Sequence, residues 1–356
     1  MTGVGIVGVG FMGMIHYLAA QRIGSGRVVA ICTRDPKKLA GDWTDIQGNF
    51  GPRGEQMNLE GINRHATFQA ILADPTVGLI DLCVPNDAHA KMAIEALEAG
   101  KDVLVEKPIA LEIEDADRMI AAARRTGRML MIAHVLPFFP EFAHARSVVE
   151  SGDFGPLLAA RFTRVISKPD WSTGIADTNR SGGPAIDLHI HDTHFIGLVC
   201  GSPIAVRSTG VVQNGAVSHL STQYLYDQPN LSVSADSGAL NQPGRPFMHG
   251  FELWMERGTL SFEFATIDGS AHVATPLTLM PEKGAAIHPP LGSGDPIDAF
   301  AAELEAATIG VRDRVVPPPL SAPRARLALA LCRAEIASVL SGETVRVAPS
   351  PAATIF

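Results

Sequence analysis

The stretch Val-Gly-Ile-Val-Gly-Val-Gly-Phe-Met-Gly at residues 4–13 decides the fold of this chain. Its apolar start predicts a strand, and residues 14–22 contain no helix breaker, so a glycine-rich turn joins a strand to a helix. In such a turn Gly8 permits the tight bend, Gly10 lets backbone N–H groups approach a pyrophosphate, and Gly13 lets the helix pack on the strand. This context predicts a dinucleotide-binding turn rather than a purely structural one. The residues expected to contact the cofactor here are Gly8, Gly10, Phe11, Met12 and Gly13.

The end of the next predicted strand, residues 28–32, bears on the choice of nicotinamide cofactor. About twenty residues after the glycine turn, an acidic side chain would bind the ribose 2′-hydroxyl of NAD, whereas a hydroxyl beside an arginine can accept the 2′-phosphate of NADP. Thr33 and Arg34 stand at this point, so NADP is favoured and NAD remains open. In the alternative interpretation Arg34 is only solvated and Asp35 caps the following helix, which is partly compatible with the first.

A second decisive stretch is Asp-Val-Leu-Val-Glu-Lys-Pro at residues 102–108. Its apolar run predicts a strand that is buried on both faces, and ligands of open parallel sheets lie outside the carboxyl ends of such strands. Lys107 is therefore expected beside a ligand. Taken alone, Glu-Lys-Pro is more typical of a solvated turn, so the prediction depends on the strands around it.

Strands alternate with helices along the first third of the chain, and this alternation predicts a doubly wound parallel sheet. We therefore expect an α/β protein whose residues 1–133 form a dinucleotide-binding Rossmann domain. Residues 41–64 are rich in glycine and predict a loop or flap. The remaining predicted strands are 67–68, 79–84 and 129–133, and the predicted helices are 69–73, 88–99 and 113–125.

From His134 onward, predicted strands follow one another with few helices between them. This pattern predicts an α+β domain at residues 134–356 with a large, mainly antiparallel open sheet, and we assign substrate binding to it. The predicted strands are 157–165, 204–212, 218–226 and 259–264, and residues 323–340 are expected to be helical.

Residues 184–200 form the second cluster with chemical potential, after the pair Gly182-Gly183. If this segment is one helix, Asp187, His191 and His194 share one face. Three interpretations compete for them: a structural Asp-His pair, a metal site of two histidines and one carboxylate, and an acid/base pair at a substrate hydroxyl.

Composition favours work on small molecules. The chain has 37 acidic and 29 basic residues and a net charge of -8, so it offers no basic field for nucleic acid or anionic lipid. No run of about 18 apolar residues predicts a membrane span. The four cysteines are scattered without metal-type pairing, which is typical of reduced packing residues, and we expect a cytoplasmic protein.

Four motifs in this order resemble the Gfo/Idh/MocA family, named after glucose-fructose oxidoreductase, inositol dehydrogenase and a rhizopine catabolism protein. They are the turn Gly8 to Gly13, Pro85-Asn86 with His89, Glu106-Lys107-Pro108, and Asp187 with His191 after the glycine pair. The resemblance implies that Lys107, Asp187 and His191 surround the carbon that exchanges a hydride with the nicotinamide. It adds Thr33, Arg34, Pro85, Asn86, His89, Glu106 and Lys107 to the residues expected at the cofactor.

The resemblance also favours the acid/base interpretation of Asp187 and His191, without a catalytic metal, and a homodimer or homotetramer formed through the C-terminal sheet. Two departures from the family bear on this. Thr33 stands where the family often has Asp, which supports NADP, and His194 stands where it often has Asp, which keeps a metal interpretation open. An Arg-Phe pair that the family frequently carries is replaced around residues 136–138, so substrate recognition does not transfer.

The expected function is an NAD(P)-dependent dehydrogenase or reductase that acts on a secondary hydroxyl or ketone of a sugar, sugar derivative or cyclitol. Two alternatives are a redox-neutral epimerase or glycosidase/lyase with a retained cofactor, and a nicotinamide-binding regulator without catalysis. The intact Lys107, Asp187 and His191 argue against the regulator. The additional candidates for substrate contact are Trp171, Arg180 and His194; a structural role is the alternative for Trp171 and Arg180.

Overall fold

The computed structural model describes residues 1–48, 50–167 and 181–347, and it consists of two compact units. The first unit contains Met1–Phe139 and Ser293–Ala325, and the second contains Pro140–Gly292 and Arg326–Phe356. A single boundary after residue 133 therefore misplaces residues 293–325, which return to the first unit. The reason is helix α11 (Pro296–Asp313), which packs against helix α1 (Phe11–Ala20).

The first unit is built on a six-stranded sheet in the order β3-β2-β1-β4-β5-β6, and every pairing in it is parallel. The chain starts in β1, runs outward to β3 and then returns to β4, so the strand order reverses between β1 and β4. Ligands of doubly wound sheets bind at the carboxyl ends beside such a reversal. The strands are β1 (Thr2–Val7), β2 (Gly26–Cys32), β3 (Asn63–His65), β4 (Leu79–Leu82), β5 (Asp102–Glu106) and β6 (Leu130–Ala133).

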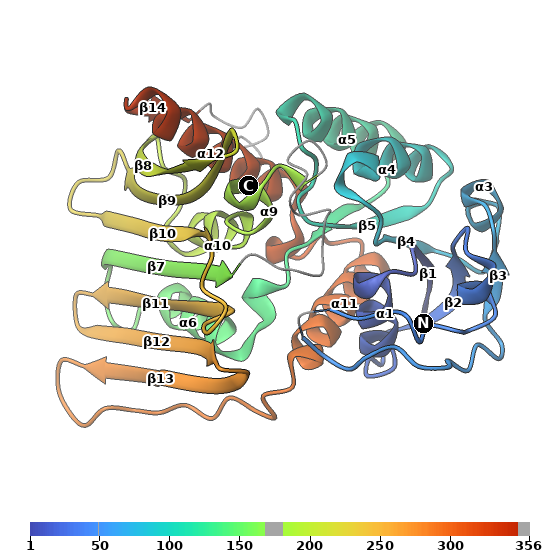
Figure 1. Ribbon diagram of the computed structural model, residues 1–356, viewed down its shortest axis with the longest axis horizontal. Coiled ribbons are helices and arrows are strands. Elements are labelled where there is room, and N and C mark those ends of the chain that lie inside the picture. Colours follow the sequence, from blue (N-terminus) through green and yellow to red (C-terminus); the bar gives the residue numbers. More distant parts are fainter. Residues whose placement is uncertain (49, 168–180, 348–356) are drawn as a thin grey trace. The chain divides into compact units, whose positions relative to one another are not determined.

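Helices cover both faces of this sheet, with α4 and α5 on one side and α1 and α11 on the other (Figure 1). Local signals explain the ends of the longer ones. In α5, Glu114 and Asp115 lie in the first turn, basic residues lie in the last turn and Gly127 ends the helix in a left-handed conformation. The other helical elements of this unit are α2 (Pro36–Leu39), α3 (Phe68–Leu72), α4 (His89–Glu98), α5 (Ile113–Thr126), η1 (Asn86–Ala88), η2 (Leu136–Phe138) and η3 (Pro318–Leu320).

The third strand lies earlier in the chain than predicted. The prediction at residues 67–68 is wrong, because Thr67 is the N-cap of α3, where its hydroxyl accepts the Ala70 N–H at 3.3 Å. The glycine-rich segment 41–64 is packed against the unit through Trp43, which is fully buried and lies edge-on to Tyr17 with ring centroids 5.0 Å apart. Neither feature follows the simple strand and helix periodicities, so the pattern alone did not reveal them.

The second unit contains an eight-stranded sheet in the order β13-β12-β11-β7-β10-β9-β8-β14 (Figure 1). Only the β10–β7 pairing is parallel, so the expected mainly antiparallel sheet is confirmed. The strands are β7 (Leu157–Ser167), β8 (Ala205–Gln213), β9 (Ala216–Leu225), β10 (Ser232–Leu240), β11 (Phe247–Met255), β12 (Gly258–Ile267), β13 (Ser270–Pro281) and β14 (Val345–Arg346).

Helices α6 (Pro140–Ser151), α9 (Pro184–Asp187) and α10 (Ile190–Val199) belong to the second unit, and α12 (Ala322–Ser341) begins in the first unit and continues into the second. Buried aromatic rings join α6 and α10 to the sheet: Phe142 lies edge-on to Phe195 and to Phe251, with centroids 5.1 Å apart in both pairs. In the described part of the chain, no helix has both the length and the apolar character that a membrane crossing requires.

Candidate active site

The glycine turn has the geometry that a dinucleotide needs. Gly8 has a φ of +95°, and a Cβ there would lie 2.3 Å from the carbonyl oxygen of Cys83. A Cβ on Gly13 would lie 2.0 Å from the carbonyl oxygen of Gly8. Around Gly10, by contrast, a Cβ would meet nothing within 4 Å among the described residues, so the backbone is open to an approaching group. Two glycines therefore shape the turn and the third leaves room for a phosphate.

Helix α1 begins at this opening, with Gly10 as its N-cap and no side chain capping it in the described structure. The first N–H groups of a helix have no partner within the helix, and their positive partial charge favours an anion. Phe11 and Met12, which follow Gly10, are half-buried. The turn and the helix start thus fit the pyrophosphate of a nicotinamide dinucleotide.

Thr33 and Arg34 lie directly after β2, the strand beside β1. Thr33 is half-buried, and its hydroxyl accepts the backbone N–H of Asp35 at 3.2 Å. Arg34 is exposed and forms no ion pair within residues 1–48, 50–167 and 181–347. Asp35 caps α2 by accepting the Lys37 N–H at 2.9 Å, as the alternative interpretation expected. The exposed Arg34 side chain therefore lies at the end of β2 and takes no part in the cap of α2.

The next two strands bring further predicted residues to the same edge of the sheet. Pro85 and Asn86 follow β4, and Lys107 follows β5. Since β2, β1, β4 and β5 are neighbours and parallel, the glycine turn, Thr33, Asn86 and Lys107 lie along one carboxyl edge. Asn86 and Lys107 are half-buried and Pro85 is exposed. The segments that carry these predicted residues therefore end along one edge of the sheet, and their contact with a cofactor stays a prediction.

His89 and Glu106, predicted as cofactor contacts, instead hold the ends of β4 and β5. The fully buried His89 ring contacts the carbonyl oxygens of Pro108 and Val84 at 2.8 and 3.0 Å. Burial lowers the pKa of His89, although both carbonyl contacts oppose this shift. The Glu106 carboxylate accepts the backbone N–H of Lys107 at 3.0 Å. Both side chains therefore fix the backbone on either side of Lys107, and their direct contact with a cofactor stays a prediction.

The segment that carries Asp187 and His191 in the second unit is not one continuous helix, which corrects the prediction for residues 184–200. Helix α9 ends at Asp187 and α10 begins at Ile190, with Leu188 and His189 forming a turn between them. The N–H of His191 is donated to the Leu188 carbonyl at 3.4 Å. Asp187 and His191 are both half-buried, and their relative orientation depends on this break.

His189 occupies the break, and its ring is fully buried. Its Nε2 lies 3.2 Å from both the Tyr224 hydroxyl on β9 and the Glu335 carboxylate on α12, and its Nδ1 lies 3.8 Å from Asp192. Burial lowers the pKa of His189, but Glu335 and Asp192 raise it to about 9. A protonated His189 therefore pins the α9–α10 turn to β9 and α12.

Asp192 and Arg164 extend this buried network. The Arg164 Nε on β7 donates to both carboxylate oxygens of Asp192, at 3.1 and 2.9 Å, and the two residues are 4% and 2% exposed. Burial raises the pKa of Asp192, but the larger combined effect of Arg164 and His189 lowers it below its usual value, so the carboxylate stays ionised. The sequence did not reveal the partners of His189 and Asp192, because Arg164 on β7 and Glu335 on α12 are distant in the chain.

The three additional substrate candidates have different outcomes. His194 is 1% exposed and lies within the second unit, so it offers little surface to a substrate there. Trp171 and Arg180 lie outside the described residues. Asp187, His191 and His194 also do not gather as metal ligands: in the described part of the chain, the group with ligand atoms within 4.8 Å of one another is His16, Asp81 and Cys83. The metal interpretation of the helical face thus has no geometric support.

The comparison with family models agrees with this geometry. Residues 2–134 match a model described as an oxidoreductase family with an NAD-binding Rossmann fold. Residues 2–134 belong to the NAD-binding part of the Gfo/Idh/MocA oxidoreductase family. The matched segment contains the glycine turn, Thr33, Pro85 and Lys107, so the resemblance seen in the sequence motifs is confirmed for the NAD-binding domain.

Two curated relatives and one solved structure are similar to this chain over longer stretches. Levoglucosan dehydrogenase of Pseudarthrobacter phenanthrenivorans is 28% identical over 234 residues, covering 66% of this chain and 57% of that protein. Bacillus subtilis scyllo-inositol 2-dehydrogenase (NAD(+)) is 27% identical over 240 residues, covering 66% and 64%. The chain spans about half the length of the first curated relatives, between 52% and 57%. Levoglucosan dehydrogenase in complex with NADH and levoglucosan superposes with a TM-score of 0.79 and 20% identity, covering 98% of this chain and 100% of that one, which shows a shared fold.

Proposed function

We propose that this protein is an NAD(P)-dependent oxidoreductase that moves a hydride between a nicotinamide and a secondary hydroxyl or ketone of a sugar, sugar derivative or cyclitol. The observation that carries the proposal is the carboxyl edge of the first sheet, where the glycine turn of an NAD-binding family domain follows β1 and Lys107 follows β5, with β4 between these two strands. The two similar curated enzymes, which are named as dehydrogenases of levoglucosan and of scyllo-inositol, support a polyhydroxylated substrate.

The chain's own residues would accept or donate the proton of the reacting hydroxyl, while the bound nicotinamide supplies the hydride acceptor or donor. Removing a hydride from a secondary alcohol requires that the hydroxyl proton leave to a nearby base. We assign this contact to the Lys107 amine and the His191 imidazole, and we assign Asp187 to orienting the His191 ring and balancing its charge. The buried His189 network holds the turn between Asp187 and His191 and thereby supports this arrangement.

A redox-neutral enzyme that oxidises and then re-reduces its substrate is the second candidate, since the same residues serve both reactions. Kinetics with a panel of sugars and cyclitols, each tested with NADP and NAD, separate the candidates. Net turnover of added cofactor identifies a dehydrogenase, whereas nicotinamide absorbance that recovers after each turnover identifies the redox-neutral enzyme. If no member of the panel reacts although the cofactor binds, a regulator without catalysis becomes the better description.

Cofactor preference gives the first prediction. We expect NADPH to bind more tightly than NADH, because the Arg34 guanidinium at the end of β2 can pair with the 2′-phosphate. A charge-assisted contact of this kind stabilises binding by roughly 1.5 to 3 kcal/mol, so Arg34→Ala should remove most of the preference. Fluorescence titration of both reduced cofactors measures it, with Arg27→Ala as the control, an exposed arginine at the other end of β2. Equal affinities in the parental protein would show that Arg34 does not select NADP.

The Asp187-His191 pair gives the second prediction. We expect His191→Asn to lower kcat by ~10² to 10⁴ and Asp187→Asn to lower it less, because Asp187 acts through the imidazole. The double variant should be little slower than His191→Asn alone, since residues that act as one unit are not additive. Steady-state kinetics with saturating cofactor test this. Multiplicative losses in the double variant would assign independent roles to the two side chains.

We also propose a homodimer or homotetramer that forms through the second sheet. The sheet exposes apolar side chains on β8 and β9, among them Val211, Val212 and Leu225, which are 42%, 47% and 37% exposed. Exposed apolar surface that gathers on neighbouring strands favours association.

We also propose a cytoplasmic location. The four cysteines are free thiols, which supports this proposal.

A further inference from the structure

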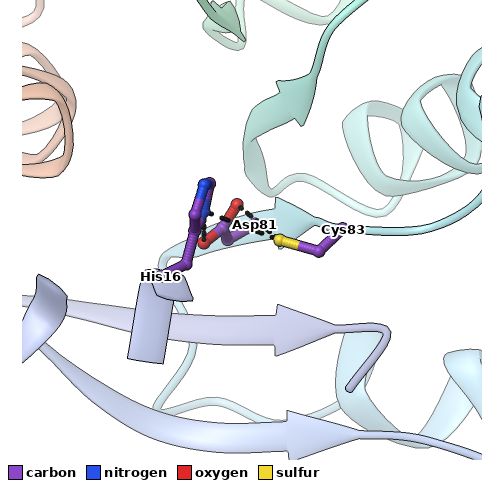
Figure 2. Close-up of side chains that lie close together, drawn as sticks. All are labelled: His16, Asp81 and Cys83. Carbon is purple, nitrogen blue, oxygen red and sulfur yellow. Dashed lines mark hydrogen bonds and ion pairs between the residues drawn. The ribbon is translucent and has the colours of Figure 1, made fainter. Parts of the chain in front are cut away.

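A buried cluster of charged side chains lies under the carboxyl edge of the first sheet and has no part in the proposed chemistry. His16 on α1 places Nδ1 2.8 Å from the Asp81 carboxylate on β4 and Nε2 3.1 Å from the Glu106 carboxylate on β5. Figure 2 shows the His16 ring against Asp81 of β4, with Cys83 directly after the end of that strand. His16 and Asp81 are fully buried and Glu106 is 7% exposed.

The number of acceptors around His16 indicates its protonation. A neutral imidazole has one N–H, but both ring nitrogens of His16 face carboxylate oxygens at hydrogen-bond distance. The cluster must therefore hold one more proton than a neutral histidine supplies. Burial lowers the pKa of His16, but the negative charge of Asp81 and the hydrogen bonds of Asp81 and Cys83 raise it well above the usual range for histidine. His16 is thus an imidazolium that donates to both carboxylates.

Glu303 on α11 is a further buried acid whose pKa is affected by the charges of this cluster. It is fully buried, and neither of its carboxylate oxygens has a hydrogen-bond partner in the described structure. Burial raises the pKa of Glu303 well above its usual range, and Glu106 and Asp81 add to this although His16 opposes it. Glu303 is therefore a neutral acid. The cluster then contains a single cation, His16, between two carboxylates.

The Glu106 side chain links His16 to the backbone of Lys107. Glu106 accepts from His16 on Oε1 and from the Lys107 backbone N–H on Oε2, at 3.1 and 3.0 Å. We propose that His16, as a buried imidazolium, is a positioning residue that holds the Glu106 carboxylate so that Glu106 fixes the backbone of Lys107 beside the substrate. This inference rests on the proposed function only for the role of Lys107; the proton on His16 is independent of it.

A metal ion is the competing occupant, because the ligand atoms of His16, Asp81 and Cys83 lie within 4.8 Å of one another. Two ligand atoms bound to one tetrahedral zinc, each at about 2 Å, are separated by about 3.3 Å. The His16 Nδ1 and Asp81 Oδ2 atoms are 2.8 Å apart, which is a direct hydrogen bond. Burial, Asp81 and Glu106 also raise the pKa of the Cys83 thiol to about 12, whereas a ligand must be a thiolate. These observations favour a proton rather than a metal ion between His16 and the carboxylate of Asp81.

The protonation is tested by nitrogen-15 NMR of labelled histidine, with the His16 signals assigned by their loss in His16→Gln. At about pH 8, where an ordinary histidine is neutral, we expect both ring nitrogens of His16 to carry a proton. Elemental analysis of the same sample should show no stoichiometric metal. A neutral tautomer for His16 at this pH, or one equivalent of bound zinc, would overturn the proposal whether or not the protein proves to be a dehydrogenase.

The positioning role is tested with two variants that each keep one of the two donors. A glutamine amide reaches the place of Nε2 and can still donate to Glu106, whereas an asparagine amide reaches the place of Nδ1 and can donate only toward Asp81. We expect His16→Asn to lower kcat roughly tenfold relative to His16→Gln, the kinetic equivalent of one charge-assisted hydrogen bond, with NADPH affinity unchanged in both. His272→Gln, an exposed histidine on β13, is the control for the substitution itself.

Amide hydrogen exchange of the Lys107 N–H supplies a readout that does not need turnover. Exchange should be faster in His16→Asn than in His16→Gln, because only glutamine still holds Glu106. A purely structural His16 would lower the free energy of unfolding in both variants without separating their kcat values or their Lys107 exchange. Equal kcat and equal exchange in the two variants would therefore refute positioning through Glu106.

Discussion

Replacing Lys107 with methionine is expected to lower kcat by ~10² to 10⁴, the range for a lost general acid or base, while NADPH affinity stays nearly unchanged. Lys107 follows β5. The Glu106 carboxylate accepts the Lys107 backbone N–H, and the His89 ring contacts the carbonyl oxygen of the next residue, Pro108. The glycine turn follows β1 instead, so most of the cofactor-binding surface does not involve the lysine side chain. Chemistry and cofactor binding should therefore separate in this variant.

Steady-state kinetics and fluorescence titration of NADPH measure the two effects in the same preparation. Lys91→Met is the matched control, because Lys91 is an exposed lysine on α4 of the same unit and should tolerate the change. If Lys107→Met kept near-parental kcat, or lost turnover only because NADPH no longer bound, Lys107 would be a cofactor or structural residue. The proposed proton transfer would then have to pass to His191 alone.

Predictions that rested on local chemistry agree with the structure. The glycine turn could be recognised from ten residues, because Gly8 and Gly13 are positions where any side chain would collide with backbone carbonyls. The parallel, doubly wound character of the first sheet followed from the alternation of strands with helices and is confirmed, together with the mainly antiparallel second sheet. The family assignment from four motifs is confirmed as well. The functional roles of Lys107, Asp187 and His191 stay predictions.

The missed elements have weak or misleading local signals. Strand β10 is rich in small residues and carries a glycine, and β11 and β13 were not expected at all. Helix α11 was missed, although Asp295 caps it by accepting the Ile297 N–H at 3.0 Å. The break between α9 and α10 depends on His189, whose partner Glu335 lies 146 residues further along the chain. A pairing of this kind exists only after the fold has brought distant segments together.

The partners of buried charged residues near the predicted site could not be predicted from the sequence either. Asp81, Glu303 and Glu335 stand in apolar stretches of sequence where a charged residue is rarely buried without a partner. Their presence therefore signals a paired or neutralised group, but the partner cannot be named from the sequence. The structure identifies it for Asp81 and Glu335, which contact His16 and His189. Each histidine in turn lies next to a segment that holds a predicted catalytic residue.

Replacing Arg164 with methionine is expected to lower the free energy of unfolding by about 3 to 5 kcal/mol, because it leaves the Asp192 carboxylate buried without its main partner. Arg164 donates to both oxygens of Asp192, and His189 is more distant, at 3.8 Å from the same carboxylate. A single imidazolium at that distance cannot replace the Arg164 N–H that both carboxylate oxygens share. The loss should therefore be far larger than that of an exposed ion pair.

Urea unfolding followed by circular dichroism measures the change, with Arg161→Met as the control. Arg161 lies on the same strand, β7, but is exposed, so its replacement should change the free energy of unfolding by less than about 0.5 kcal/mol. Adding Asp192→Asn to Arg164→Met should recover part of the stability, because a neutral amide no longer leaves a buried charge uncompensated. If Arg164→Met were no more destabilising than Arg161→Met, or if the second substitution made the protein still less stable, the Asp192 charge would not be what Arg164 stabilises.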